Sequence, residues 1–508
     1  MSEHENDYSG WQPAGSDAFL TKKREAIFGI VILLLGLVLG NCLIFGGMNL
    51  GFVLALLGTL AGTVVYLIRS GCRGGWYAWT VLGLCAAIIP GFARTDDGFV
   101  KFVMGNFLFV GINLGLTTLA GRNMWNPAGI GSLLDSFRSF FGLGFGKLPY
   151  SFRGIRTAVR EGGTATKNGT SVLLGVVIAV PILAIMIPLL MRSDAAFEGL
   201  LDLLPEFNFT EAYATVLFGG LLGCVLYTRT VALVRLAPEV PMEASQRRGL
   251  SHLTMNTVLY AVCGLYVVYL FSQLAYFVGG FSGILPEGYS LAEYARRGFF
   301  EMAWLCAINL TVMVLGISVT EKRDGKTPIS TRIACLFIGM VTLFLVFTAG
   351  AKMLLYIGGY GMTRMRVLTM VIMIFLGFAT AVVCVWLFAP KVPYMKILVI
   401  SALVIGAAVL WTDVDSVVAG YNVDAYLTGK LETVDVDHLS GLGSGAVPHL
   451  DRLAAEAKAS LVREQAENVL RGWWIGNADD LRAWNFTDWI ARDILEQWVW
   501  SEDSELLS

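Results

Sequence analysis

The chain has 508 residues, of which 56% are hydrophobic and only 15% charged, and its mean hydropathy is +0.65. Because soluble domains carry about 25% charged residues, this composition excludes a soluble globular enzyme and, with apolar runs of 18 or more residues, predicts an all-α, polytopic membrane protein. The net charge of −2 gives no broad basic surface, so we expect no nucleic-acid partner.

Residues 1–25 are polar and end in Lys22, Lys23 and Arg24. The apolar runs of residues 26–412 then predict a transmembrane domain of eleven helices. These helices are expected at 26–47, 50–68, 76–93, 102–120, 171–191, 213–235, 254–279, 298–319, 333–356, 367–389 and 395–412.

The distribution of basic residues predicts the orientation, because Lys and Arg are enriched on the cytoplasmic side of membrane proteins. With the N-terminus inside, the inner segments hold 21 Lys and Arg residues and the outer loops hold 7. We therefore expect a plasma-membrane protein with a cytoplasmic N-terminus. Eleven helices then place the C-terminal region outside.

Several predicted helices carry glycines four residues apart: Gly36/Gly40, Gly58/Gly62, Gly111/Gly115 and Gly219/Gly223. Small residues at this spacing let two helices approach closely. The pattern favours packing inside one chain, and a dimer face is the alternative.

The inner loop 121–170 combines an apolar and a basic segment. Ile130, Leu133, Leu134, Phe137, Phe140 and Phe141 recur at helical spacing, which predicts an amphipathic helix in the membrane interface. Arg153, Arg156 and Arg160 follow on one helix face and are candidate contacts for the anionic headgroups of membrane lipids. Alternatively, this basic loop only sets the orientation.

Residues 413–508 differ in composition from the membrane domain. They hold 18 acidic and 7 basic residues and many tryptophans. Helical periodicity over 447–471, and a second helix with a cap near Asn477 or Asp479, predict a small helical appendage. Such a region offers a surface to a protein partner.

Unusual polar residues gather where the predicted topology places the outer face. Glu293, Arg297 and Glu301 are spaced four apart and share one helix face. The full candidate outer polar site comprises Glu293, Arg296, Arg297, Glu301, Asn309, Lys352, Tyr356, Tyr360, Arg364 and Asp413. Charges at membrane depth need partners or water, so the set indicates either a structural ion-pair network or an outward-open pocket for an anionic ligand.

Catalytic and metal-binding patterns are weak in this sequence. No pair of the eight cysteines has CxxC spacing, and none of the four histidines falls inside an apolar run. We therefore expect no metal and no cofactor. No nucleophile is paired with a base in sequence, so we predict no catalytic residues.

Three blocks of residues resemble a known family. They are Tyr294–Ala295–Arg296–Arg297–Gly298–Phe299–Phe300–Glu301, then Tyr360–Gly361–Met362–Thr363–Arg364, and Tyr421–Asn422–Val423 with Ala446–Val447–Pro448. Over about residues 170–450 the chain resembles a bacterial multi-pass membrane family known as domain of unknown function 4173. The resemblance implies an integral-membrane fold without an established activity, and it carries over no functional residues.

Two main functions are compatible with these features. The first is transport, or handling of lipid or envelope material, through the outer polar site. The alternative is a non-catalytic envelope sensor, regulator or scaffold that acts through the C-terminal region. A transferase acting on a lipid-linked substrate is less favoured, because its only acid/base candidates are Glu293 and Glu301.

The orientation yields a direct prediction. Reporter fusions at residues 160 and 325 should report the cytoplasm, and fusions at 205 and 285 should report the outside, because the basic excess fixes the inner loops. An inverted signal at any of the four positions would show that the helix count is wrong.

Overall fold

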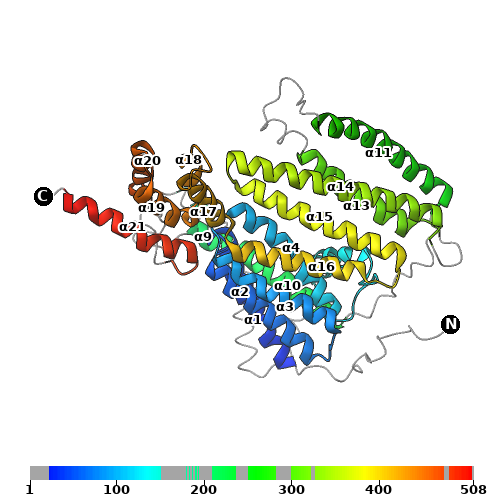
Figure 1. The fold of residues 1–508 in the computed structure, drawn as a ribbon. Coiled ribbons are helices and arrows are strands. Elements are labelled where there is room, and N and C mark those ends of the chain that lie inside the picture. The colour runs from blue at the N-terminus through cyan, green and yellow to red at the C-terminus, as the bar shows by residue number, and fades with distance from the viewer. Residues whose placement is uncertain are drawn as a thin grey trace. The chain divides into compact units, whose positions relative to one another are not determined.

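The computed structural model describes residues 22–149, 209–235, 250–281, 299–321, 327–473 and 480–505, with scattered positions between 175 and 193. These residues are almost entirely helical (Figure 1). Ten of the described helices are long and apolar enough to cross a membrane. The prediction of an all-α, polytopic membrane protein is confirmed.

The chain divides into two compact units, which we describe separately. Unit 1 comprises residues 1–241 and 475–489, and unit 2 comprises residues 242–474 and 490–508. The C-terminal region therefore contributes to both units.

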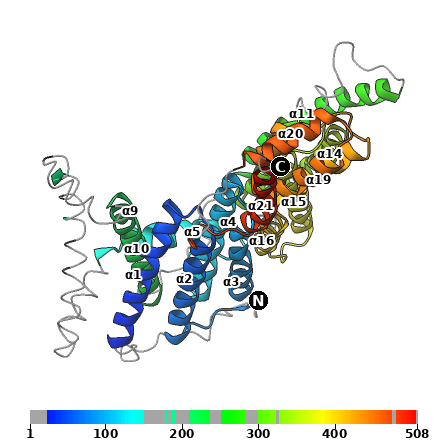
Figure 2. The same cartoon turned by 90° about the vertical axis from the view of Figure 1, so that its left-hand side faces the viewer.

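Unit 1 contains membrane helices that run side by side (Figure 2). They are α1 (Lys22–Ile44), α2 (Leu50–Arg69), α3 (Trp76–Ile88), α4 (Gly98–Leu119) and α10 (Gly220–Arg235). The short helix α9 (Phe209–Ala214) and the π-helical turn η3 (Thr215–Gly219) lead into α10. After Ile88, α3 tightens into the 3₁₀ turn η1 (Ile89–Ala93), because Pro90 has no backbone N–H to donate to an α-helix.

The contacts at the two ends of unit 1 fix the direction of α4 and α10. Lys101, at the start of α4, bonds the α1–α2 loop at Gly47, and Asn41 at the end of α1 bonds Glu211 before α10. At the other end, Arg122 after α4 bonds Leu233 near the end of α10. The two helices thus run the same way, so an odd number of crossings must connect them. The predicted helix 171–191, which lies mostly outside the described residues, would supply one crossing.

Glycines bring α1 and α10 into backbone contact. A Cβ added at Gly36 would lie 2.4 Å from the Cα of Gly223, and one at Gly40 would lie 2.4 Å from the Cα of Gly219. Such contact is possible only between residues without side chains. These glycines therefore pack inside one chain, as the spacing favours.

The predicted amphipathic helix is α5 (Gly131–Phe137), which continues as the π-helical segment η2 (Arg138–Phe145). Its exposed face is apolar and consists of Ile130, Leu134, Phe137, Phe141 and Phe145. Its fully buried face is polar and consists of Ser132, Asp135, Ser136 and Ser139. Arg153, Arg156 and Arg160 lie outside the described residues, so their contact with lipid stays a prediction.

Unit 2 contains the helices α11 (His252–Phe281), α13 (Phe299–Val319), α14 (Ile329–Tyr360), α15 (Arg364–Phe388) and α16 (Tyr394–Thr412). Helices α13, α14 and α15 lie side by side (Figure 1) around an apolar core that includes Cys306, Leu345 and Met373. With 32 residues, α14 is about 48 Å long. Because the hydrocarbon layer is about 30 Å thick, α14 must extend past it.

The C-terminal region is helical, as predicted. Its elements are α17 (Val414–Leu427), α18 (Val436–Ser440), η5 (Ser444–Ala446), α19 (Val447–Glu456), α20 (Ser460–Arg471) and α21 (Phe486–Glu505). The prediction of a last helix capped near Asn477 or Asp479 is wrong. The helix begins at Phe486, because the side chain of Asn485 accepts the N–H of Thr487 and so caps it.

The glycine contact gives a test of the packing in unit 1. Gly36→Ala should lower the free energy of unfolding by about 2–3 kcal/mol, because its Cβ would overlap the α10 backbone. Gly83→Ala in α3 is the matched control. No atom lies within 4 Å of the added Cβ at position 83. Helix propensity alone should therefore leave the free energy of unfolding unchanged or raise it by up to about 1 kcal/mol. Thermal unfolding in detergent measures both, and equal stabilities would contradict the α1–α10 contact.

Candidate functional site

The residues predicted to form the outer polar site fall into several places. Glu293, Arg296 and Arg297 lie outside the described residues, so the full site stays a prediction. Glu301 is exposed near the start of α13, and Lys352 is half-buried in α14. Asn309 lies in the helix bundle, where it accepts a hydrogen bond from Tyr266 at 2.7 Å and donates one to Thr342 at 2.9 Å. Asn309 is therefore satisfied by its neighbours in the bundle.

Arg364 lies in a polar cluster that we call the helix junction of unit 2. Its Nε donates to Oδ1 of Asp415 at 2.6 Å, and the Asp415 side chain is only 3% exposed. The next arginine, Arg366, places its guanidinium 3.9 Å from the centre of the Tyr356 ring and donates to the carbonyl of Tyr360 at 3.2 Å. These contacts join the end of α14, the start of α15 and the first turn of α17.

Asn422 completes the helix junction. Its Nδ2 donates to the carbonyl of Met362 at 2.8 Å, and its Oδ1 accepts the N–H of Met362 at 2.7 Å. Gly361 has φ +75°, and a Cβ there would lie 2.6 Å from Oδ1 of Asn422. Glycine is thus required at position 361 for this close approach.

Asp413 stands at the bend between α16 and α17. It is buried and has φ +46°, a left-handed conformation that non-glycine residues rarely adopt. Gly445 packs against it, because a Cβ there would lie 2.9 Å from Oδ2 of Asp413.

A side-chain hydrogen bond joins α17 to α19, because Oγ of Ser416 lies 3.1 Å from Nε2 of His449. Burial lowers the pKa of His449.

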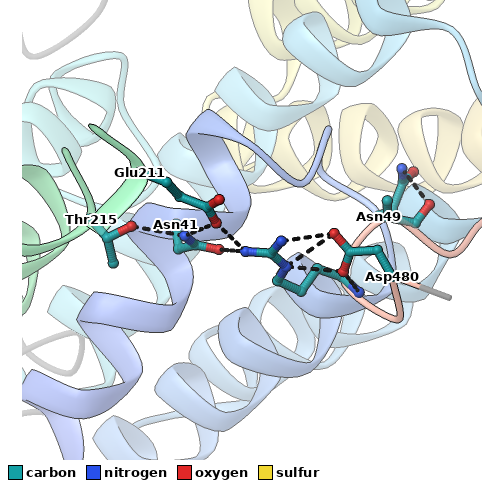
Figure 3. Close-up of polar contacts among 7 residues, drawn as sticks. Asn41, Asn49, Glu211, Thr215 and Asp480 are labelled. Atoms are coloured by element: carbon teal, nitrogen blue, oxygen red, sulfur yellow. Dashed lines mark hydrogen bonds and ion pairs between the residues drawn. The ribbon is translucent and has the colours of Figure 1, made fainter. Parts of the chain in front are cut away.

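A second polar cluster lies in unit 1, and we call it the tail-docking site. Arg482 donates from Nη1 to Glu211 and to Oδ1 of Asn41, the latter at 2.8 Å. Its Nε and Nη2 each bond one oxygen of Asp480, at 2.9 and 2.8 Å. Asn41 in turn donates to Glu211 at 2.9 Å and to Thr215 at 2.8 Å (Figure 3). Arg482 lowers the pKa of Asp480, and the two acidic groups raise the pKa of Arg482.

The tail-docking site continues into a buried set of polar groups. Asn485 is 1% exposed and donates to Oδ1 of Asn49 at 3.1 Å and to the carbonyl of Thr95 at 2.8 Å. Lys101 is 3% exposed and donates to Oδ1 of Asn49 at 2.5 Å and to the carbonyl of Gly47 at 3.0 Å. One asparagine of the α1–α2 loop thus accepts from a membrane-helix lysine and from the C-terminal segment.

The C-terminal segment also caps helix α2. The N–H groups of Leu50 and Gly51 donate to the carbonyls of Trp484 and Arg482, at 3.1 and 3.3 Å. The first N–H groups of a helix have no partner inside the helix. The segment therefore supplies acceptors that α2 itself lacks.

Backbone strain coincides with both clusters. Among the described residues, Met48 and Asp413 are the two non-glycine residues with positive φ, at +57° and +46°. Met48 belongs to the loop that holds Lys101, and Asp413 precedes Asp415 of the helix junction by two residues. Strained residues persist where surrounding contacts hold them, and they concentrate at functional sites.

Sequence reasoning missed the tail-docking site. Lys101 is one of the seven basic residues that the predicted topology places in outer loops, and its position directly before an apolar run is typical of an exposed flanking lysine. Arg482 and Asp480 give no signal of docking either, since alternating charges are common in any acidic tail. Within the described ranges, no group of three or more His, Cys, Asp or Glu side chains is placed to hold a metal.

A comparison with family models identifies this chain. The model for "Domain of unknown function (DUF4153)" matches residues 33–453, which is most of the chain. The chain therefore belongs to this family. The match supports the expected uncharacterised membrane family but not the number 4173 that the motifs indicated. No curated protein and no solved structure matches the chain.

Proposed function

We propose that this integral membrane protein is a non-catalytic sensor, regulator or scaffold whose C-terminal region meets a protein partner outside the bilayer. The observation that supports this function is the tail-docking site. There, residues 480–486 bind the ends of four membrane elements of unit 1 through polar contacts, of which those of Asn485 are buried.

The energetics of docking make the C-terminal segment part of the fold. Without it, the first N–H groups of α2 and the carbonyl of buried Thr95 would each lose a partner. An unsatisfied buried polar group costs about 1–3 kcal/mol. The charged contacts of Arg482 count for less, because that side chain is partly exposed. The segment is thus held in one position and is not a free tether.

The charge of the C-terminal region indicates the chemistry of the partner. Its exposed acidic residues include Glu432, Asp437, Glu456, Glu464, Asp493 and Glu496. A surface of this kind is repelled by anionic lipid headgroups and complements a basic protein surface. We therefore propose a partner protein with a basic face.

The location of the docking site agrees with the proposed topology. The α1–α2 loop and the start of α4 form the end of unit 1 that the distribution of Lys and Arg assigns to the outside. The C-terminal segment binds that same end. We therefore propose a plasma-membrane protein with its N-terminus in the cytoplasm and its C-terminal region outside.

Transport or lipid handling through an outward-facing polar site is the second proposal. It is favoured by the helix junction, where Tyr356, Tyr360 and Arg364 lie at the ends of α14 and α15, and by Asp413, which follows the end of α16. The Arg364–Asp415 pair is already closed. An anionic ligand would have to compete with Asp415, which makes this proposal the weaker of the two.

Photocrosslinking in cells tests the partner proposal. A photoreactive residue placed at Leu461 or Leu481, which are 65% and 72% exposed, should give adducts of discrete protein size. The same residue at Phe102, an exposed position of membrane helix α4, should give none. Asn485→Ala should abolish the adduct at Leu481, because the segment loses its buried bonds, whereas Asn468→Ala on exposed α20 should not. Absence of adducts at both tail positions, or equal adducts at Phe102, would contradict the proposal.

A further inference from the structure

Arg229 is a charged residue buried inside a membrane helix of unit 1. It lies in α10, is 2% exposed and is among the largest fully buried side chains of the described residues. It precedes the end of the helix at Arg235 by six residues, which is about 9 Å along the axis. At this depth a guanidinium needs an anionic or polar partner.

The partners within the described residues do not satisfy Arg229. Its Nε donates to Oγ of Ser139 at 3.1 Å, and its Nη2 is buried without a hydrogen-bond partner there. The carboxylate on the facing segment, Asp135, is used elsewhere. It accepts the N–H groups of Met124 and Trp125 at 3.0 and 3.2 Å. Arg229 thus keeps donor capacity and an uncompensated charge.

The segment that faces Arg229 carries further polar side chains and packs closely against α10. Ser139 lies at the start of η2, whose wide π-helical turns are often found at functional sites. Ser132 lies seven residues before Ser139, which places both on one helix face, and its buried Oγ has no partner among the described residues. Gly144 lets η2 approach α10 closely, since a Cβ there would lie 2.8 Å from Cγ1 of Val225.

The opposite side of the same segment is shaped for lipid. Phe137, Phe141 and Phe145 are 43–53% exposed and form aromatic contacts with one another or with Phe109 and Phe140. A helix whose apolar face is exposed and whose polar face is buried suits contact with acyl chains. One short segment thus carries a buried polar face and an exposed apolar face.

The charge around Arg229 selects an anion. Two further arginines belong to the elements around it. Arg138 in η2 places its Nη1 3.6 Å from Asp135, and Arg122, after α4, donates to the carbonyls of Leu233 and Val234 at the end of α10. Asp135 is thus engaged by Arg138 as well as by two backbone N–H groups. Guanidinium groups bind phosphate oxygens with short, charge-assisted hydrogen bonds.

We propose that Arg229 and Ser139 bind the phosphate group of an anionic phospholipid, whose acyl chains pass around the side of η2 and reach the exposed phenylalanines of α5 and η2. Serine donates its hydroxyl to a phosphate oxygen while Arg229 donates from Nη2. This site differs from the predicted Arg153, Arg156 and Arg160 contacts, and it does not depend on the C-terminal region.

Native mass spectrometry of the purified full chain tests the site. The wild type, mixed with phosphatidylglycerol or with zwitterionic phosphatidylcholine, should retain phosphatidylglycerol preferentially. Arg229→Gln should retain about tenfold less, because a charge-assisted hydrogen bond is lost, and Arg229→Lys should be intermediate because it keeps the charge but loses the planar fork. Arg69→Gln is the matched control, since Arg69 is an exposed arginine that ends α2, and it should behave as the wild type.

Each alternative result has a defined meaning. Displacement of the lipid by millimolar inorganic phosphate, with equal retention by Arg69→Gln, would assign the site to free phosphate and overturn the lipid proposal. Equal retention by the wild type and Arg229→Gln, or no preference over phosphatidylcholine, would also overturn it. If Arg229→Gln does not fold, Arg229→Lys and Ser139→Ala supply the comparison, and both must retain less phosphatidylglycerol than Arg69→Gln.

Discussion

A cation buried in a membrane protein must find its hydrogen-bond partners in the chain or in a ligand, because hydrocarbon offers none. Three described cations meet this constraint in different ways. Lys101 is held by backbone and amide oxygens of the α1–α2 loop. Arg364, whose side chain is 28% exposed, pairs with the carboxylate of the buried Asp415. Arg229 donates from Nε to Ser139, and its Nη2 has no hydrogen-bond partner among the described residues.

The contacts of Lys101 explain why the C-terminal segment binds unit 1. Asn49 accepts from Lys101 and from Asn485, so the same oxygen serves the membrane helix and the C-terminal segment. The α1–α2 loop reaches Lys101 through the positive φ of Gly47 and Met48. The segment stabilises that strained loop by bonding the first N–H groups of α2. Docking and burial of the lysine are thus parts of one arrangement.

The sequence predicts the elements of this protein better than their contacts. Apolar runs identify the membrane helices because hydrophobic length is a local property, and the motif blocks at 360–364 and 421–423 do meet, through Asn422 and Met362. The bond between Arg482 and Glu211 joins residues 271 positions apart, and no local pattern encodes it. The sequence gives no signal of the buried Arg229, because one arginine scarcely changes the hydropathy of a 23-residue apolar run.

The docking of the C-terminal segment on unit 1 is the central claim, and disulfide formation in membrane vesicles tests it most directly. In a chain whose eight native cysteines are replaced, Asn49→Cys and Asn485→Cys should form a disulfide, because these side chains are in hydrogen-bond contact. Arg73→Cys, beyond the opposite end of α2 and about 30 Å away along the helix, should form none with Asn485→Cys. Mass spectrometry of the linked peptides measures both pairs. Absence of the 49–485 disulfide, or equal yields for the two pairs, would contradict the account.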